Sequence, residues 1–377
     1  MSSAGPPPAS GAWREGDEPG RRRWHELPEP LLLESGERLP GVRLAYETWG
    51  RLAPDGGNAV LVLHALTGDS HVHGPADPGH PTPGWWDGLV GPGRALDPER
   101  WFVVCANVLG GCQGSTGPAS TAPHEGPWGS RFPRTTVRDQ VAAELSLADA
   151  LGVDCWAAVV GGSMGGMRAL EWAVGQPDRV AGLAVVASTA EASAEQIALC
   201  ATQLHAVRSD PRWRGGDYYD ALDGDGPHVG LGLARRIAHV SYRSEPELRA
   251  RFDRQPQRDE DPLRGGRFAV ESYLEHHGDK LARRFDAGSY VALTEAMNSH
   301  DVGRGRGDVE AALSRVTART VVVGIDSDRL YPPYQQERIA KAVPDAELYL
   351  VPSLYGHDGF LLETPSLGPL LRAAWEG

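Results

Sequence analysis

The chain has little of what marks a disulfide-stabilised, membrane-spanning or nucleic-acid-binding protein. Its 377 residues include only four cysteines. They show no C-x-x-C spacing, which argues against a disulfide framework and favours buried, reduced thiols. No apolar run approaches the roughly 20 residues of a membrane span, and the N-terminus lacks the apolar core of a secretory signal. With 50 acidic and 37 basic side chains, the chain is expected to bind neither nucleic acid nor membranes. We therefore predict a cytoplasmic protein in which an anionic substrate would need a local basic pocket.

Short apolar runs, several of them rich in valine, alternate with helical segments in the rest of the chain. Such runs are typical of strands in a parallel sheet that is covered on both faces. Helical patterns occupy 135–151 and 164–177, and strands are expected within 58–66, 100–110, 154–162, 179–188, 319–326 and 346–353. The alternation predicts an α/β fold with a mostly parallel central sheet flanked by helices.

The domain organisation follows from where these patterns stop. Residues 1–25 are rich in proline, glycine and charge and are predicted to be a disordered tail. A β-hairpin around a Ser-Gly turn is expected within 26–50. The interval 191–316 has helical stretches but no comparable valine-rich run, so it is predicted to be an inserted helical cap. The core then comprises 26–190 and 317–377.

A glycine-rich turn around Ser163 carries the first chemical signal. Residues 161–165, GGSMG, fit the pattern G-x-S-x-G and lie between an expected strand and an expected helix. In this context the pattern indicates a nucleophile elbow, a strained turn that exposes the serine oxygen above the sheet and needs small neighbours. The five-residue pattern alone would favour an incidental serine in a glycine-rich turn.

A serine nucleophile needs a base, and the base needs an acid that orients it. On this fold the chain order is serine, acid, histidine, and His357 is the only histidine after the last expected strand. Two carboxylates, Asp326 and Asp328, follow the strand within 319–326. Their spacing does not separate them, because Asp326 would equally suit a turn cap. Met164 and Leu66 are the expected backbone N–H donors of an oxyanion hole.

The loop 64–74, HALTGDSHVHG, also invites a metal interpretation through Asp69, His71 and His73. No fourth ligand follows at zinc spacing, and short histidine-rich turns are usually only solvated. No metal site is therefore expected.

Motifs along the chain together resemble those of the homoserine O-acetyltransferase family. They include GGSMGGMRALEWA, HALTGDSHVHG, CANVLGGCQGSTGP, LARRIAHVSYR, NSHDVGRGRG, SDRLYPP and YGHDGF, and the resemblance runs from about residue 31 to the C-terminus. It implies an α/β-hydrolase core with a helical lid, a homodimer, and transfer of acetyl from acetyl-CoA to L-homoserine in methionine biosynthesis. No tightly bound cofactor is implied, because acetyl-CoA is a co-substrate.

The resemblance also assigns residues. It places the catalytic triad at Ser163, Asp328 and His357, and so chooses Asp328 over Asp326. It places substrate binding at Arg235 and Asp358. A guanidinium suits the carboxylate of homoserine and a carboxylate suits its ammonium group. From the residues alone, Arg235 would equally be a solvated helix charge and Asp358 a helix N-cap.

Several alternatives stay open at this point. Arg304 and Arg306 are candidates for the phosphates of CoA, although the CoA-binding residues are otherwise unassigned and basic loop residues are often only solvated. The same scaffold would suit succinyl-CoA as donor or serine as acceptor, since one methylene is discriminated by only about 1–3 kcal/mol. An esterase is the rival of another class, because it would admit water to the same site.

Overall fold

The computed structural model describes residues 5–123 and 126–376. The parallel part of the sheet is as the sequence predicts, and each of the six expected strands forms. The strands are β1 (Arg23–Glu26), β2 (Leu31–Leu32), β3 (Arg38–Leu39), β4 (Arg43–Trp49), β5 (Ala59–Leu63), β6 (Phe102–Ala106), β7 (Ala158–Gly162), β8 (Gly182–Val186), β9 (Arg319–Ile325) and β10 (Glu347–Val351).

Within the described residues, the main sheet has eight strands in the order β1-β4-β6-β5-β7-β8-β9-β10. The six strands from β6 to β10 are parallel to one another, whereas β4 is antiparallel to β6 and β1 is antiparallel to β4. The predicted hairpin is confirmed as the short pair β2–β3, in which Leu31 lies opposite Leu39. Beyond it the chain continues as β4 into the main sheet.

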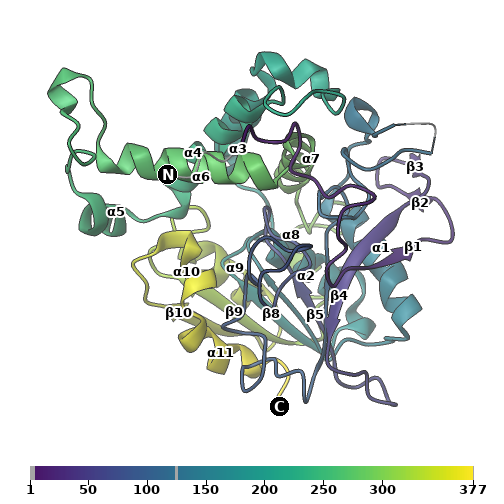
Figure 1. The fold of residues 1–377 in the computed structure, drawn as a ribbon. Helices are drawn as coiled ribbons and strands as arrows, with labels where there is room; N and C mark the ends of the chain where they lie inside the picture. The colour runs from purple at the N-terminus through teal and green to yellow at the C-terminus, as the bar shows by residue number, and fades with distance from the viewer. Residues whose placement is uncertain (1–4, 124–125, 377) are drawn as a thin grey trace.

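Both faces of the sheet are buried, which explains the unbroken apolar runs. Along β5, Leu61 and Leu63 belong to the hydrophobic cluster on one face, and Val60 and Val62 belong to the cluster on the other. Figure 1 shows helices on both sides of this sheet. The helices are α1 (Val137–Leu151), α2 (Met164–Gly175), α3 (Ala194–Arg208), α4 (His228–Tyr242), α5 (Glu245–Phe252), α6 (Ala269–Arg284), α7 (Ala287–Asn298), α8 (Val309–Leu313), α9 (Pro333–Ala342), α10 (Gly359–Leu362) and α11 (Thr364–Arg372). None of those helices is long and apolar enough to cross a membrane.

Helices α3 to α8 fill the interval that the sequence assigns to a cap. Figure 1 shows α3, α4, α6 and α7 grouped on one side of the sheet, with α5 and the segment before α6 extending away from the body. Side chains of α3, α4, α6 and α7 form a third cluster with Met164 and Met167 of α2. Helix α8 lies within the predicted limits of the cap but packs with the core, because Val309 and Ala312 share a cluster with the sheet. The division at 316 itself remains a prediction.

The predicted disordered tail is wrong for residues 5–25, whereas residues 1–4 of that prediction lie outside the described residues. The Ser10 hydroxyl donates to Asp286 at 2.7 Å, and the Trp13 N–H donates to the carbonyl of Cys112 at 2.9 Å. Arg22 is buried and donates to the carbonyl of Gly79 at 2.8 Å. The segment has no periodic apolar pattern of its own and is rich in proline, glycine and charge, which is why the sequence predicted disorder. Polar anchors supplied by distant loops hold it in place.

The cysteine prediction is confirmed for three of the four thiols. Cys105, Cys112 and Cys200 are free and buried, and Cys155 is free and partly buried. Burial raises the pKa of the Cys112 thiol to about 12, so this thiol stays protonated and acts as a small apolar side chain.

Candidate active site

Ser163 occupies the strained turn between β7 and α2. Its φ of 57° and ψ of −126° place a non-glycine residue in a conformation that L-residues rarely adopt. Neighbouring backbone comes close enough to require glycine on either side. A Cβ on Gly165 would lie 1.9 Å from the Leu63 carbonyl oxygen, and a Cβ on Gly161 would lie 2.1 Å from the Gly165 carbonyl oxygen. The glycines therefore let α2 begin directly against the end of β5, as a nucleophile elbow requires.

Ser163, His357 and Asp328 form a continuous hydrogen-bonded series. The Ser163 hydroxyl lies 2.9 Å from Nε2 of His357, and Nδ1 of His357 lies 2.7 Å from Oδ2 of Asp328. All three residues are buried. The serine follows β7, the aspartate follows β9, and the histidine lies in the short 3-10 helix η5 (Gly356–Asp358) after β10. The geometry is that of a nucleophile, a general base and a group that orients the base.

The two aspartates after β9 have separate roles in the structure. Asp328 accepts hydrogen bonds from the N–H groups of Leu330 and Tyr331 at 2.8 and 2.9 Å through Oδ1, while its other oxygen faces His357. Asp326 accepts from the N–H of Ser353 at 2.9 Å, and within the part of the chain that the structure describes the carboxylate bonded to the His357 ring is that of Asp328. Asp326 therefore links the end of β9 to the loop after β10 and takes no part in the series.

The loop after β5 is anchored beside the start of α2. Nε2 of His64 accepts from the Val108 N–H at 3.0 Å, and Arg168 donates to the His64 carbonyl at 2.8 Å. Burial and the Arg168 charge lower the pKa of His64 to about 3, so the ring is neutral. Leu66 of this loop and Met164 share a hydrophobic cluster. Met164 is the first residue of α2, where backbone N–H groups have no acceptor within the helix.

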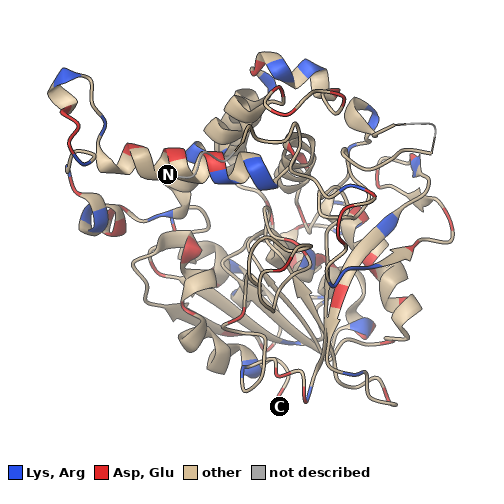
Figure 2. Cartoon of the chain, viewed as in Figure 1, with Lys and Arg blue, Asp and Glu red and all other residues tan. Residues whose placement is uncertain are grey.

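A cavity of about 310 Å³ lies between the cap and the core next to this series. Its walls include Thr67, Arg235, Arg243, Lys280, Arg284 and Asp358. Thr67 and Asp358 are the chain neighbours of Leu66 and His357. Figure 2, in which the ribbon is coloured by residue type, marks basic residues at the end of α6 that lies next to α7. The chain carries a net charge of −13 and yet has the local basic pocket that an anionic substrate would need.

Arg235 and Asp358 meet in this cavity. The Arg235 guanidinium lies 5.2 Å from the centre of the Tyr242 ring, and that ring lies 5.8 Å from the ring of His357. The Asp358 carboxylate makes no side-chain N-cap bond to α10 and instead lies 3.2 Å from the guanidinium of Arg243. Burial raises the pKa of Asp358, while Arg243 and Arg235 oppose the shift. Arg235 is therefore not simply a solvated helix charge, and Asp358 is not a side-chain N-cap of α10.

Other candidates from the sequence do not reach the cavity. Arg304 forms an ion pair with Glu34 at 2.9 Å, and Arg306 forms one with Glu171 at 2.7 Å. Both arginines that were candidates for binding the phosphates of CoA are therefore used in structural ion pairs. The residues considered as a metal set do not converge either, since His73 bonds to Asp87 at 2.7 Å. Asp69 instead accepts from the backbone N–H of His71 at 2.9 Å.

Sequence reasoning missed several residues around the site. Arg243, Lys280 and Arg284 line the cavity together with His239 and His277. Burial and the Arg235 charge lower the pKa of His239 to about 2 and that of His277 to about 4, so both rings are neutral. The available signal was the density of basic and histidine residues in α4 and α6. That signal does not say which side of each helix faces inward.

Comparison with known proteins identifies the family. Residues 58–364 match the family model of the alpha/beta hydrolase fold. The chain is 65% identical over 368 residues to a homoserine O-acetyltransferase of Thermobifida fusca (strain YX), and the match covers 97% of each protein.

Two solved structures are similar over nearly the whole chain. One is homoserine O-acetyltransferase from Bacillus anthracis, with a TM-score of 0.86, 26% identity, and coverage of 94% of this chain and 97% of that one. The other is esterase E22, with a TM-score of 0.85, 25% identity, and coverage of 94% and 99%. The same architecture therefore occurs in proteins named as transferases and as esterases, so the fold alone does not separate the two activities.

Proposed function

This chain belongs to the homoserine O-acetyltransferases of the α/β-hydrolase fold, and we propose that it transfers acetyl from acetyl-CoA to the hydroxyl of L-homoserine. The products are O-acetyl-L-homoserine and CoA, in methionine biosynthesis. The observation that carries the proposal is the buried series of Ser163, His357 and Asp328 beside a cavity that contains Arg235 and Asp358.

The first half-reaction forms an acetyl-enzyme. His357 takes the Ser163 proton on Nε2, and the serine oxygen attacks the thioester carbonyl. The N–H groups of Met164 and Leu66 stabilise the oxyanion. Asp328 keeps Nδ1–H of the imidazole directed toward itself and stabilises the imidazolium. When the tetrahedral intermediate collapses, the C–S bond breaks and the CoA thiolate leaves with the proton from His357.

The second half-reaction consumes the acetyl-enzyme. Arg235 holds the homoserine carboxylate, and Asp358 holds its ammonium group. His357 takes the proton of the homoserine hydroxyl, and the hydroxyl oxygen attacks the acetyl carbonyl. As the ester bond to the serine breaks, His357 gives that proton to the Ser163 oxygen. The buried position of the serine limits competing hydrolysis by water.

The transferase is favoured over its alternatives by the relative at 65% identity, which is named as a homoserine O-acetyltransferase. The likeness to esterase E22 is much lower in identity, at 25%. Succinyl-CoA as donor and serine as acceptor are not favoured. Steady-state rates with acetyl-CoA and succinyl-CoA, each against homoserine and serine, should be highest for acetyl-CoA with homoserine.

We further propose a cytoplasmic homodimer that needs no tightly bound cofactor. Val229, Leu233 and Val240 of α4 are exposed by 70%, 46% and 47% and are spaced by four and seven residues, so they lie along one stripe of the helix. An exposed apolar stripe of this kind suits a subunit contact. Sedimentation equilibrium of the purified chain should give twice the monomer mass of 40.4 kDa, and a monomer would contradict the dimer.

The nucleophile is tested by replacing it. Ser163→Ala should lower acetyl transfer to homoserine by at least about 10⁴-fold, because no other group forms the acetyl-enzyme. If this variant retained full activity, the proposed mechanism would be wrong. Rapid hydrolysis of acetyl-CoA by the wild type without homoserine would instead favour the esterase.

A further inference from the structure

His239 of α4 lines the cavity and has no part in the mechanism above. The residue is only 2% exposed, and neither of its ring nitrogens has a hydrogen-bond partner among the described residues. Buried polar groups in folded proteins are nearly always hydrogen-bonded, so a buried imidazole with both nitrogens free needs an explanation. Because this ring lines a cavity, a bound ligand can supply the missing partners.

The packing of α4 against α6 fixes the His239 ring without satisfying its nitrogens. The two helices approach closely at Gly232 and Gly278, where a Cβ on Gly278 would lie 2.8 Å from the Gly232 carbonyl oxygen. The His239 ring stacks on that of Tyr273, with centroids 5.6 Å apart and an interplanar angle of 17°. It also makes a T-shaped contact with the His277 ring at 4.0 Å and 82°. Ring contacts therefore hold the imidazole in place and leave its nitrogens available.

The surroundings of the ring keep it neutral. Burial, followed by the charge of Arg235, lowers the pKa of His239 to about 2. A neutral imidazole has one N–H donor and one acceptor nitrogen. Anionic groups of a ligand are attracted instead by the cationic side chains of the cavity, which are Arg235, Arg243, Lys280 and Arg284. His239 therefore suits a neutral group that both donates and accepts, and an amide is such a group.

The choice of ligand rests on the proposed function, under which two substrates reach Ser163 in turn. Homoserine has a carboxylate, an ammonium group and a hydroxyl, which the mechanism assigns to Arg235, Asp358 and His357. It has no amide. Acetyl-CoA reaches the serine through its pantetheine arm, which is neutral and contains two amides. Acetyl-CoA is therefore the substrate whose groups match the free donor and acceptor of His239.

The position of His239 relative to the catalytic base also fits the arm. The Tyr242 ring lies 5.7 Å from the His239 ring and 5.8 Å from the His357 ring, so Tyr242 connects the two histidines. In an extended pantetheine arm, the two amide nitrogens lie about 4 and 8 Å from the sulfur. An arm whose thioester is at Ser163 can therefore bring an amide to His239.

We propose that His239 binds an amide of the pantetheine arm of acetyl-CoA through its ring nitrogens. The residue then contributes to the choice of acyl donor, because it favours a thioester whose arm carries amides over one whose arm does not. This role differs from that of Arg235, one turn earlier on α4, which binds the acceptor. Helix α4 thus contributes to the binding of both substrates.

The test compares two acetyl donors on the full-length protein in the absence of homoserine. S-acetylpantetheine has both amides and no phosphate, whereas S-acetyl-2-mercaptoethanol has no amide. The rate constant for acetylation of Ser163 is measured with each donor, and the ratio of the two cancels general damage to the active site. His239→Phe keeps a ring against Tyr273 but removes both nitrogens. It should lower the ratio by about 5- to 100-fold, the range expected when a buried hydrogen bond is lost.

His276→Phe is the matched control. His276 is an exposed histidine of α6 that lies outside the described wall of the cavity, so its variant should have the wild-type ratio. Homoserine should discharge the acetylated His239→Phe protein within about twofold of the wild-type rate, because the acceptor is bound by other residues. His239→Leu also lacks the ring nitrogens and takes the place of His239→Phe if that variant does not fold.

An unchanged ratio in the His239 variant would overturn the inference and would mean that water satisfies the ring. Slow discharge by homoserine together with an unchanged ratio would also overturn it, and would assign His239 to the acceptor. If neither donor acetylated the wild-type protein, the proposed function itself would be contradicted, and the inference with it.

Discussion

The hydrogen-bonded triad and the cavity next to it are built in opposite ways. In the triad, both ring nitrogens of His357 have partners, and Asp328 accepts two backbone N–H groups in addition to the imidazole. In the cavity, neither ring nitrogen of His239 has a hydrogen-bond partner among the described residues, and Nε of Arg243 is likewise buried without one. The triad is complete in the free protein, whereas the cavity has polar groups left for a ligand.

This difference has a structural origin. The triad residues follow the carboxyl ends of β7, β9 and β10, which a parallel sheet brings to one edge. The cavity forms where α4 and α6 of the cap meet the loop after β5 and the start of α10. Under the proposed function, the sheet therefore positions the groups that carry out the chemistry, and the position of the cap determines how homoserine is bound. Variants of the two regions should accordingly differ in which kinetic constant they change.

The largest difference between a variant and its control is expected within the triad. Asp328→Asn should lower kcat by about 10³- to 10⁴-fold, because an amide no longer favours the imidazole tautomer that has its proton on Nδ1. Asp326→Asn is the matched control on the same loop and should change kcat less than about threefold, since Asp326 only accepts from the Ser353 N–H. Steady-state rates with acetyl-CoA and homoserine compare the two. Equal losses would mean that catalysis does not distinguish Asp328 from Asp326.

An intermediate effect is expected in the cavity. Arg235→Gln should raise the KM for homoserine by about 10- to 100-fold, the loss of a charge-assisted hydrogen-bonded pair worth about 1.5–3 kcal/mol. The first half-reaction should remain intact, because Arg235 does not contact the triad directly.

The neighbouring Arg236→Gln serves as the control for that variant. Arg236 is also on α4 but lines a different cavity with Asp279 and Arg283, so the KM for homoserine should stay within about twofold of the wild-type value. If both substitutions raised KM alike, a general distortion of α4 would be the better explanation.

The smallest effect concerns the junction between the cap and the core. Nε2 of His300, just after α7, lies 3.2 Å from the Thr189 carbonyl, just after β8, and burial lowers the pKa of His300 to about 3. Below about pH 6.5 the unfolded chain binds a proton on this ring that the folded chain refuses, so stability falls as the pH falls from about 6.5 toward 3.

His300→Gln should remove up to about 1.4 kcal/mol per pH unit from the slope of the free energy of unfolding between pH 6 and pH 4. Urea unfolding at several pH values measures that slope. His64, whose pKa is also about 3, remains in the variant and keeps part of the acid sensitivity. An unchanged slope would mean that His300 is not held neutral in the folded state.

The parts of the molecule that local sequence patterns encode were predictable. The short apolar runs identified β5 to β10, and the glycines around Ser163 identified the elbow, because each of these features depends on residues that are neighbours in the chain. His357 followed from chain order, but only the family resemblance chose Asp328 over Asp326. Local spacing holds no information about which carboxylate turns toward a histidine 29 residues away.

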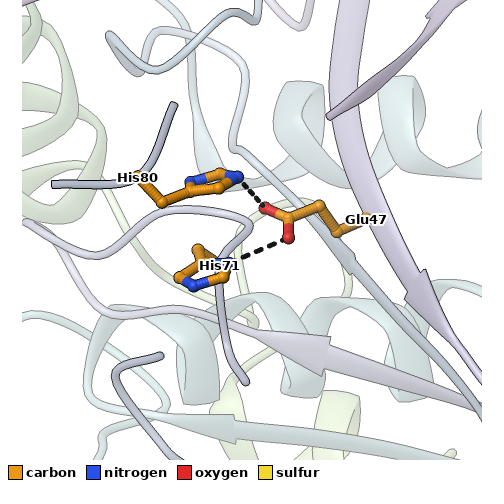
Figure 3. Close-up of side chains that lie close together, drawn as sticks. All are labelled: Glu47, His71 and His80. Atoms are coloured by element: carbon orange, nitrogen blue, oxygen red, sulfur yellow. Dashed lines mark hydrogen bonds and ion pairs between the residues drawn. The ribbon is translucent and has the colours of Figure 1, made fainter. Parts of the chain in front are cut away.

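Prediction from the sequence failed where segments that are distant in the chain come into contact. The order of residues 5–25 depends on Asp286 and on the loop near Gly79, which composition does not reveal. Likewise, His71 and His80 are both buried against the Glu47 carboxylate (Figure 3), and the loop motif did not indicate this contact because Glu47 is distant in the sequence. The cationic side chains Arg243 and Arg284 were missed for the same reason, since they line the cavity only where the cap meets the loop after β5.

The most direct test mixes acetyl-CoA with wild-type protein and with Arg235→Gln in the absence of homoserine. Both should release about one equivalent of CoA rapidly and gain about 42 Da, the mass of an acetyl group, on the peptide that contains Ser163. Homoserine should then discharge the wild-type acetyl-enzyme much faster than that of the variant. An acetyl group on another residue, or an Arg235→Gln protein that cannot be acetylated, would contradict the separation of chemistry from recognition.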